Sequence, residues 1–169
     1  MKTTQEKLAA LRGKDKIRIL FVCLGNICRS PAADGIMHSI VEERGLAHRF
    51  EIDSAGIGAW HVGQLPDQRM RVHARRRGYE LTHHARQVRS YDFEDFDLVI
   101  GMDSGNISDL RELAPSPEAE EKIVPMIDLV HNLTTTYQCI PDPYYEGAEG
   151  FELVLDMLED GINHLVDCL

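Results

Sequence analysis

The sequence lacks any apolar run close to the roughly 18 to 20 residues that span a lipid bilayer. Its N-terminal segment MKTTQEKLAALRGKDK contains only the short apolar group LAAL, whereas a secretory signal peptide needs about 7 to 15 apolar residues. We therefore expect residues 1–15 to form a disordered or frayed extension that precedes one domain at residues 16–169. We also expect a cytoplasmic protein that does not act at a membrane.

Cysteine and positive charge are scarce as well. The 169 residues include four cysteines, too few for a fold that depends on disulfides. No C-x2-C pair occurs, and no cysteine lies at zinc-ligand spacing from a pair of histidines, so the sequence predicts neither a metal nor a cofactor. The formal net charge of -10 argues against a general nucleic-acid-binding surface.

Strand-like and helix-like segments alternate along the chain, a pattern typical of parallel strands joined by helices. Strands are predicted at residues 17–22, 49–53, 96–102 and 122–128, the last with Pro125, which favours an edge position or a break. Helices are predicted from Ser30 to Gly45, from Pro66 to Gly78, from residue 103 to 114, and at 151–169. We expect an α/β fold, a three-layer sandwich whose central four-stranded parallel sheet is flanked by helices.

The stretch CLGNICRS lies between the first strand and the first helix. Ligands bind at this edge of open α/β sheets, and the N-terminus of a helix attracts anions. Gly25 allows close approach of the backbone, and Asn26 tolerates left-handed dihedral angles. Successive N–H groups of such a loop form a concave nest for phosphate oxygens, and Arg29 supplies a planar fork for two of them.

Cys23 begins this loop and is the candidate nucleophile. Alone, a cysteine at the end of a buried strand is most simply a small apolar side chain. A thiol beside a helix N-terminus and an arginine, however, has its pKa lowered from about 8.5 to roughly 3.5 to 7.5. The combination of strand, Cys-x5-Arg-Ser and helix therefore predicts a thiolate at neutral pH, to which the Ser30 hydroxyl donates a hydrogen bond.

Several longer motifs resemble one family. FVCLGNICRSP at residues 21–31 and DPYY at 142–145 are similar to motifs of the low-molecular-weight protein tyrosine phosphatases. The resemblance extends over DSAG at 53, HHARQV at 83, GMD at 101 and FELV at 151. It implies a four-stranded parallel sheet flanked by helices, no metal, and hydrolysis of phosphotyrosine monoesters through a phosphocysteine intermediate.

The resemblance also implies roles for individual residues. Asp142 matches the general acid that protonates the leaving phenolate and then acts as base, although an aspartate between prolines is by itself only a turn residue. Cys28 matches a neighbour that forms a reversible disulfide with the nucleophile. The remaining positions are phosphate-binding Leu24, Gly25, Asn26, Ile27, Cys28 and Arg29, loop-supporting Asn26, Ser54 and His83, and substrate-wall Trp60, Tyr144 and Tyr145.

Other functions remain open at this stage. Arsenate reductases of the same fold need two further cysteines close together downstream, which this sequence lacks between residues 79 and 106. Protein-arginine phosphatases similar to this family carry threonine where Ile27 stands, and a non-catalytic phosphotyrosine-binding module would have lost Cys23 or Asp142. The expected partners are phosphotyrosine-containing proteins or peptides, phosphate or other oxyanions, and a tyrosine kinase that would act on Tyr144 or Tyr145.

The predicted second helix is basic, with arginines at positions 69, 71, 75, 76 and 77. A solvated helix face is the simpler interpretation of these charges. The alternative is that they attract acidic phosphopeptides.

Overall fold

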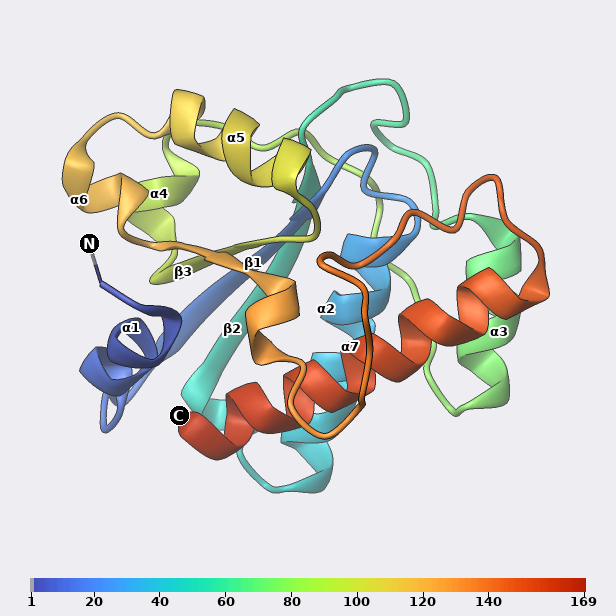
Figure 1. Cartoon of the computed structure of the whole chain (residues 1–169), viewed down its shortest axis with the longest axis horizontal. Helices are drawn as coiled ribbons and strands as arrows, with labels where there is room; N and C mark the ends of the chain where they lie inside the picture. Colours follow the sequence, from blue (N-terminus) through green and yellow to red (C-terminus); the bar gives the residue numbers. More distant parts are fainter. Residues whose placement is uncertain (1) are drawn as a thin grey trace.

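A four-stranded parallel sheet forms the centre of the molecule, in the order β2-β1-β3-β4. The computed structural model describes residues 2–169. The strands are β1 (Ile17–Cys23), β2 (Phe50–Gly56), β3 (Leu98–Gly101) and β4 (Ile123–Pro125). Helices cover both faces of the sheet (Figure 1), which confirms the predicted three-layer fold.

Strand β1 is buried on both faces because its side chains alternate between two apolar cores. Ile17, Ile19 and Phe21 belong to one core, and Leu20 and Val22 belong to the other. This alternation explains the nearly continuous apolar run, since a central parallel strand has no solvent-exposed face.

One face of the sheet is covered by α2 (Arg29–Glu43) and α7 (Ala148–Cys168), with α3 (Gln68–Arg76) packed against α7. The larger core lies here and takes most of its side chains from β1, α2 and α7. The amphipathic pattern predicted for the last helix is confirmed, because the apolar residues at helical spacing are buried: Phe151, Val154, Leu155, Leu158, Ile162, Leu165 and Val166.

The other face is covered by α4 (Asp92–Asp95), α5 (Ser104–Leu113) and α6 (Pro117–Glu120). The short helices α4 and α6 have no counterpart in the sequence prediction, since four residues contain too few turns for a helical period. Strand β4 lies at the edge of the sheet, as Pro125 suggested, and it ends there in the 3-10 helix Met126–Leu129.

Element boundaries differ from the sequence prediction by a few residues. Helix α2 starts at Arg29, so Ser30 is inside its first turn instead of capping it. Strand β2 extends to Gly56, three residues beyond its predicted end. Strand β3 is shorter than predicted because only residues 98–101 pair with a neighbouring strand.

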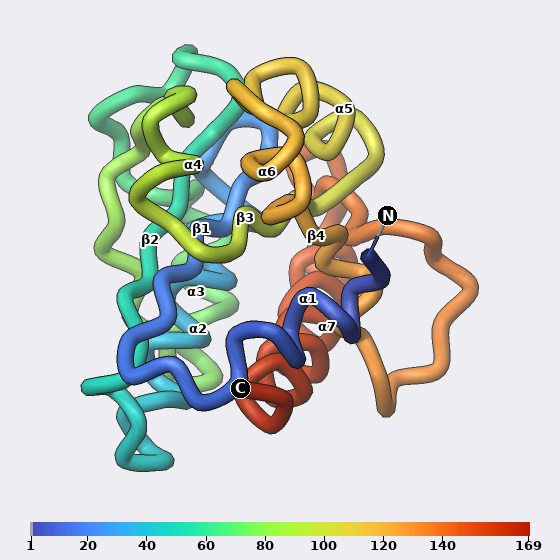
Figure 2. Tube along the Cα trace, turned by 90° about the vertical axis from the view of Figure 1, so that its left-hand side faces the viewer, coloured from blue at the N-terminus to red at the C-terminus, as the bar shows by residue number. Residues whose placement is uncertain are grey.

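The prediction of a frayed N-terminal extension is wrong for residues 4–11. These residues form α1, with the Thr3 hydroxyl accepting a hydrogen bond from the N–H of Glu6. Leu8 is fully buried in the larger core. Figure 2 shows α1 beside α7 near the end of the chain, where Arg12 Nε donates to the Cys168 carbonyl over 3.2 Å. One buried leucine thus anchors a segment that lacks a long apolar pattern.

Among residues 2–169, no helix has both the length and the apolar character that a membrane span requires.

Candidate active site

The loop between β1 and α2 lies at the carboxyl edge of the parallel sheet, where the sequence placed the anion site. Asn26, with φ of 58°, is the one described residue other than glycine in the left-handed region. No described residue accepts a hydrogen bond from the main-chain N–H groups of residues 24–28. Those groups are therefore available to an oxyanion, which agrees with the predicted nest.

Cys23 is the last residue of β1, and its Sγ receives two polar contacts from Ser30. The Ser30 hydroxyl lies 3.0 Å from Sγ, and the Ser30 main-chain N–H donates to Sγ over 3.4 Å. Because Ser30 is in the first turn of α2, the sulfur also lies at the positive end of that helix. Both contacts favour a negative charge on sulfur, which is what a nucleophile and leaving group requires.

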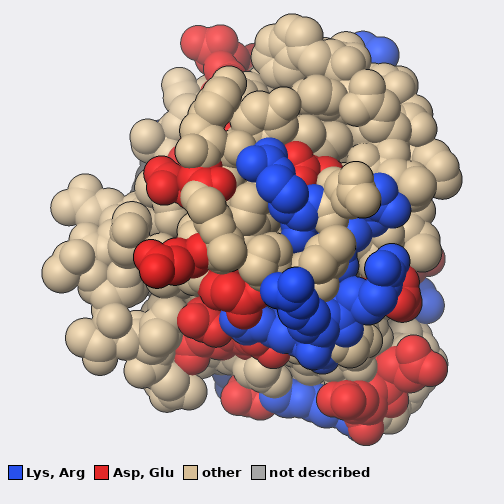
Figure 3. Space-filling model, turned by 90° about the vertical axis from the view of Figure 1, so that its right-hand side faces the viewer, with Lys and Arg blue, Asp and Glu red and all other residues tan. Residues whose placement is uncertain are grey.

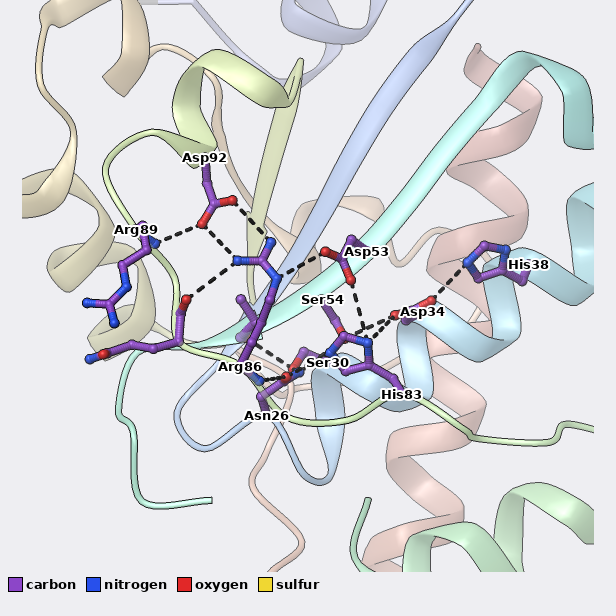
Figure 4. Close-up of polar contacts among 12 residues, drawn as sticks. Asn26, Ser30, Asp34, His38, Asp53, Ser54, His83, Arg86, Arg89 and Asp92 are labelled. Atoms are coloured by element: carbon purple, nitrogen blue, oxygen red, sulfur yellow. Dashed lines mark hydrogen bonds and ion pairs between the residues drawn. The ribbon is translucent and has the colours of Figure 1, made fainter. Parts of the chain in front are cut away.

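The buried Asn26 side chain connects the loop to two other segments (Figure 4). Its Nδ2 donates to Ser30 Oγ over 2.7 Å and to Ser54 Oγ over 3.1 Å. Its Oδ1 accepts hydrogen bonds from His83 Nε2 and from the Arg86 main-chain N–H, each over 3.0 Å. The three residues predicted to support the loop therefore lie together, and their contacts hold Asn26 in its left-handed conformation.

Arg29 is almost fully buried and is held by one terminal nitrogen. Its Nη1 donates to Asp103 Oδ2 over 2.7 Å and to the Ile140 carbonyl over 3.0 Å. Its Nε and Nη2 donate to no described residue, although Nη2 lies 3.7 Å from Asp142 Oδ2. Burial acts to lower the pKa of Arg29, but Cys23 and the two carboxylates outweigh it and raise the pKa, so the guanidinium stays charged.

Asp142 lies on the loop that precedes α7 and faces the same pocket as Cys23. Its side chain is 40% exposed, and its Oδ1 accepts a hydrogen bond from the Tyr144 N–H over 3.0 Å. The turn that contains Tyr144 is stabilised by a cation–π contact, because the guanidinium of Arg69 lies 5.3 Å from the centre of the Tyr144 ring. A solvent-accessible carboxyl group at the mouth of the pocket can exchange protons with a leaving group or with water.

The pocket has a volume of about 290 Å³ and an apolar wall. Trp60, Tyr144 and Tyr145 all line it, as predicted for the substrate wall, with Trp60 69% and Tyr145 91% exposed. His61 also lines it and had no predicted role. Leu24, Gly25, Ile27 and Cys28 line the pocket floor with Cys23 and Arg29. Aromatic walls above an anion site suit an aryl phosphate, because the ring can stack while the phosphate enters the loop.

Cys28 is buried in the same loop as a free thiol. Burial raises its pKa well above the ordinary value, and the nearby carboxylate of Asp67 and then Cys23 add to this effect. Cys28 is therefore kept protonated at neutral pH, in contrast to the role proposed for Cys23. The predicted disulfide between them stays a prediction.

Two functional side chains were missed by the sequence prediction. Asp103 accepts the Arg29 hydrogen bond with Oδ2 while its Oδ1 caps α5 by accepting from the Asn106 N–H over 2.8 Å. Arg86 reaches Asp53 with Nε over 3.0 Å and Asp92 with both terminal nitrogens over 3.1 Å. Both residues lie within motifs that carried the family resemblance, GMD and HHARQV, and this was the available signal.

The helix that was predicted to be basic is α3, whose sequence contains four of the five arginines and whose C-cap is Arg77. Figure 3 shows positively and negatively charged side chains interspersed on this side of the molecule. Arg77 stabilises the folded structure, because it forms ion pairs with Glu152, Asp156 and Glu159 of α7. Arg75 pairs with Glu80 over 3.1 Å. This mixture of charges is what a solvated helix face shows, and it agrees with the simpler interpretation of the sequence.

Comparison with known proteins agrees with this geometry. A family model described as low molecular weight phosphotyrosine protein phosphatase matches residues 18–169. A low molecular weight protein-tyrosine-phosphatase of Streptomyces coelicolor is 42% identical over 142 residues, covering 84% of this chain and 87% of that protein.

Solved structures show the same relationship. A protein tyrosine phosphatase of Entamoeba histolytica, crystallised with Hepes in the active site, superposes with a TM-score of 0.85 at 41% identity and covers 90% of this chain and 96% of that one. A Drosophila arginine phosphatase superposes with a TM-score of 0.81 at 29% identity over 89% of this chain and 96% of that one. This chain therefore belongs to the low molecular weight phosphotyrosine protein phosphatase family.

Proposed function

We propose that this protein is a protein tyrosine phosphatase that hydrolyses phosphotyrosine monoesters through a phosphocysteine intermediate. The observation that carries the proposal is one pocket that holds Cys23, Arg29 and Asp142 beneath an apolar wall with three aromatic residues. The loop N–H groups and the free edge of Arg29 would bind the phosphate oxygens, and Trp60 and Tyr144 would contact the ring.

In the first step, the Cys23 thiolate attacks phosphorus and an S–P bond forms. The P–O bond to the tyrosine ring breaks, and protonated Asp142 gives its proton to the phenolate oxygen that leaves. Arg29 and the loop N–H groups stabilise the charge on the equatorial oxygens in the transition state.

In the second step, water attacks the phosphorus of phosphocysteine. The Asp142 carboxylate removes a proton from that water, the S–P bond breaks, and inorganic phosphate leaves. The electron pair of the S–P bond returns to Cys23 as thiolate, which the hydroxyl and the N–H of Ser30 stabilise.

Ile27 supports phosphotyrosine over phosphoarginine as the substrate. The sequence prediction associated threonine at this position with arginine phosphatases, and the apolar Ile27 side chain lines the pocket floor. The positions of the two downstream cysteines argue against arsenate reduction. Cys139 precedes Ile140, whose carbonyl contacts Arg29, whereas Cys168 is the last residue of α7. A relay of two adjacent downstream cysteines is therefore not formed within the described chain.

We further propose that phosphotyrosine proteins are its cytoplasmic substrates and that a tyrosine kinase modifies Tyr144 or Tyr145. Tyr145 is 91% exposed, so its hydroxyl is accessible to an enzyme.

The test is a comparison of phosphotyrosine, phosphoarginine and phosphoserine peptides as substrates, with arsenate reduction assayed in parallel. Turnover confined to phosphotyrosine, lost in Cys23→Ser, is expected. In Asp142→Ala, mass spectrometry of acid-quenched reactions should find that Cys23 carries an added phosphoryl group (HPO3) of about 80 Da. Preference for phosphoarginine, or hydrolysis by Cys23→Ser, would contradict the proposal.

A further inference from the structure

The turn that carries Asp142 has few main-chain contacts of its own. The Tyr144 N–H donates to Asp142 Oδ1 over 3.0 Å, and the Glu146 N–H donates to the Pro143 carbonyl over 2.9 Å, so both hydrogen bonds lie within the turn. Residues 130–147 belong to no helix or strand of the described chain. The position of the Asp142 carboxyl group therefore depends on side-chain contacts between this turn and the helices beside it.

Arg69 of α3 makes a side-chain contact that reaches this turn. Its guanidinium carbon lies 5.3 Å from the centre of the Tyr144 ring and 5.0 Å from the centre of the Phe151 ring. Both distances are within the roughly 6 Å over which a cation and an aromatic face attract each other. Phe151 is buried in the first turn of α7, so one cation connects the Asp142 turn to the start of that helix.

Asp67 fixes the direction in which the Arg69 guanidinium points. Its Oδ1 accepts a hydrogen bond from Arg69 Nε over 3.1 Å, and its Oδ2 accepts one from Arg69 Nη2 over 2.9 Å. This two-point pairing sets the plane of the guanidinium, which a single ammonium group could not do. The hydrogen bonds from Arg69 lower the pKa of Asp67, so both partners are charged at neutral pH.

Asp67 also connects this contact to the phosphate loop. Its main-chain N–H donates to the carbonyl of Ile27, in the middle of that loop, over 2.7 Å. Helix α3 is itself fixed, because Met70 and Ala74 are buried in the larger core. The start of α3 therefore contacts both the loop that follows the nucleophile and the turn that carries the proton donor.

We propose that Arg69, oriented by Asp67, is a positioning residue that holds the Asp142 carboxyl group at the mouth of the pocket. This inference rests on the proposed phosphatase function, in which Asp142 gives a proton to the leaving group. Arg69 acts through Tyr144, whose ring it contacts and whose N–H donates to Asp142 Oδ1. Loss of the Arg69 guanidinium should therefore impair proton donation more than it impairs the attack of the thiolate.

The experiment compares two aryl phosphates that differ in their need for a proton donor. Phenolate is a strongly basic leaving group and 4-nitrophenolate a weakly basic one, so phenyl phosphate depends more on Asp142. The measured quantity is kcat/KM, which includes the departure of the phenol. Arg69→Gln should lower it by about fivefold or more for phenyl phosphate, part of the roughly 10²- to 10⁴-fold that a general acid contributes, and by less than about twofold for 4-nitrophenyl phosphate.

Matched variants separate this role from a general loss of structure. Arg69→Lys keeps the charge but loses the two-point pairing, so it should behave like Arg69→Gln. Arg76→Gln, at an exposed arginine of the same helix, should leave both rates unchanged. In Tyr144→Ala, which lacks the ring, adding Arg69→Gln should change the ratio of the two kcat/KM values by less than about twofold. Circular dichroism and urea unfolding establish that each variant is folded.

A second measurement does not require turnover. Backbone 15N order parameters of residues 142–146, measured by NMR, should lie near the value of about 0.85 for rigid backbone in the unmodified protein and fall toward about 0.6 in Arg69→Gln. They should stay unchanged in Arg76→Gln. Failure of this inference is thus distinguishable from failure of the proposed function, which the unmodified protein would reveal by hydrolysing neither ester.

Three results would overturn the proposal. An equal decline for the two esters in Arg69→Gln would show that Arg69 has no specific effect on proton donation. A full rate with phenyl phosphate in Arg69→Lys would contradict the role of the two-point pairing with Asp67. Unchanged order parameters of residues 142–146 in Arg69→Gln would show that Arg69 does not hold the turn.

Discussion

Replacing Asn26 by alanine should destabilise the protein and disable the loop. The substitution removes the acceptor for two donors, His83 Nε2–H and the Arg86 main-chain N–H. Each donor left without a partner costs about 1 to 3 kcal/mol, so the expected loss in free energy of unfolding is about 2 to 6 kcal/mol. The catalytic rate should fall as well, because the loop N–H groups lose their fixed orientation.

Asn26→Gly separates the side-chain contacts from the backbone conformation. Glycine loses the same hydrogen bonds but adopts the φ of 58° without the cost of about 1 to 2 kcal/mol that alanine incurs in this region. The glycine variant should therefore be more stable than the alanine variant by about 1 to 2 kcal/mol.

Urea unfolding followed by circular dichroism measures these differences, and kcat with an aryl phosphate measures the state of the loop. An alanine variant that is as stable as the glycine variant would show that the left-handed conformation of residue 26 is not imposed by the fold. A loss well below about 2 kcal/mol would show that the four contacts of the side chain are replaced by water.

Three further changes test other parts of the structure. Gly56→Ala should lower stability by about 1 to 3 kcal/mol, because its Cβ would lie 3.0 Å from the main-chain nitrogen of Asn26. Leu8→Ala should cost about 2 to 5 kcal/mol in urea unfolding, because Leu8 is buried in the larger core. The hydrogen bond to Asp34 raises the pKa of His38, although burial opposes it. His38 Nε2 lies 3.1 Å from Asp34 Oδ1. The stability that protonated His38 contributes is complete below about pH 6.5 and is lost as pH rises through the raised pKa, so the loss in free energy of unfolding caused by His38→Gln should shrink from acidic to basic pH.

Each of these changes has a matched control. Gly147→Ala places a Cβ where no atom lies within 4 Å. Leu65→Ala removes the same side chain from a position that is 43% exposed, and His48→Gln changes an exposed histidine. If a control loses as much free energy of unfolding as its matched variant, the close contact assigned to Gly56 or the burial assigned to Leu8 is contradicted. A deficit of His38→Gln that stays constant with pH would contradict the assigned ion pair.

The layers of the fold could be predicted from the sequence because the apolar patterns are long. The nearly continuous apolar run of β1 indicated a strand buried on both faces, and the helical spacing from Phe151 onward indicated α7. Helix α1 was missed because its stability depends on a tertiary contact, the burial of Leu8. Helices α4 and α6 are too short for a period to be recognised.

The candidate site was predictable where its residues are contiguous. Residues 23–30 run without a break from the end of β1 into the first turn of α2, and their spacing alone indicated an oxyanion site. Asp103 and Arg86 were missed because their partners, Arg29 and Asp53, are distant in sequence. The family resemblance connected Asp142 to the loop, since an aspartate between prolines has no chemical signature of its own. Non-local contacts of this kind require the folded chain.

The two reactive groups of the pocket belong to segments of very different local stability. Cys23 ends the strand that is paired on both edges and buried on both faces, so its amide should exchange with deuterium only when the whole domain opens. Asp142 belongs to residues 130–147, a part of the described chain with no helix or strand. On heating, the segment that contains Asp142 should therefore become mobile at a lower temperature than the strand that holds Cys23. Catalytic activity should then decline before the whole domain unfolds.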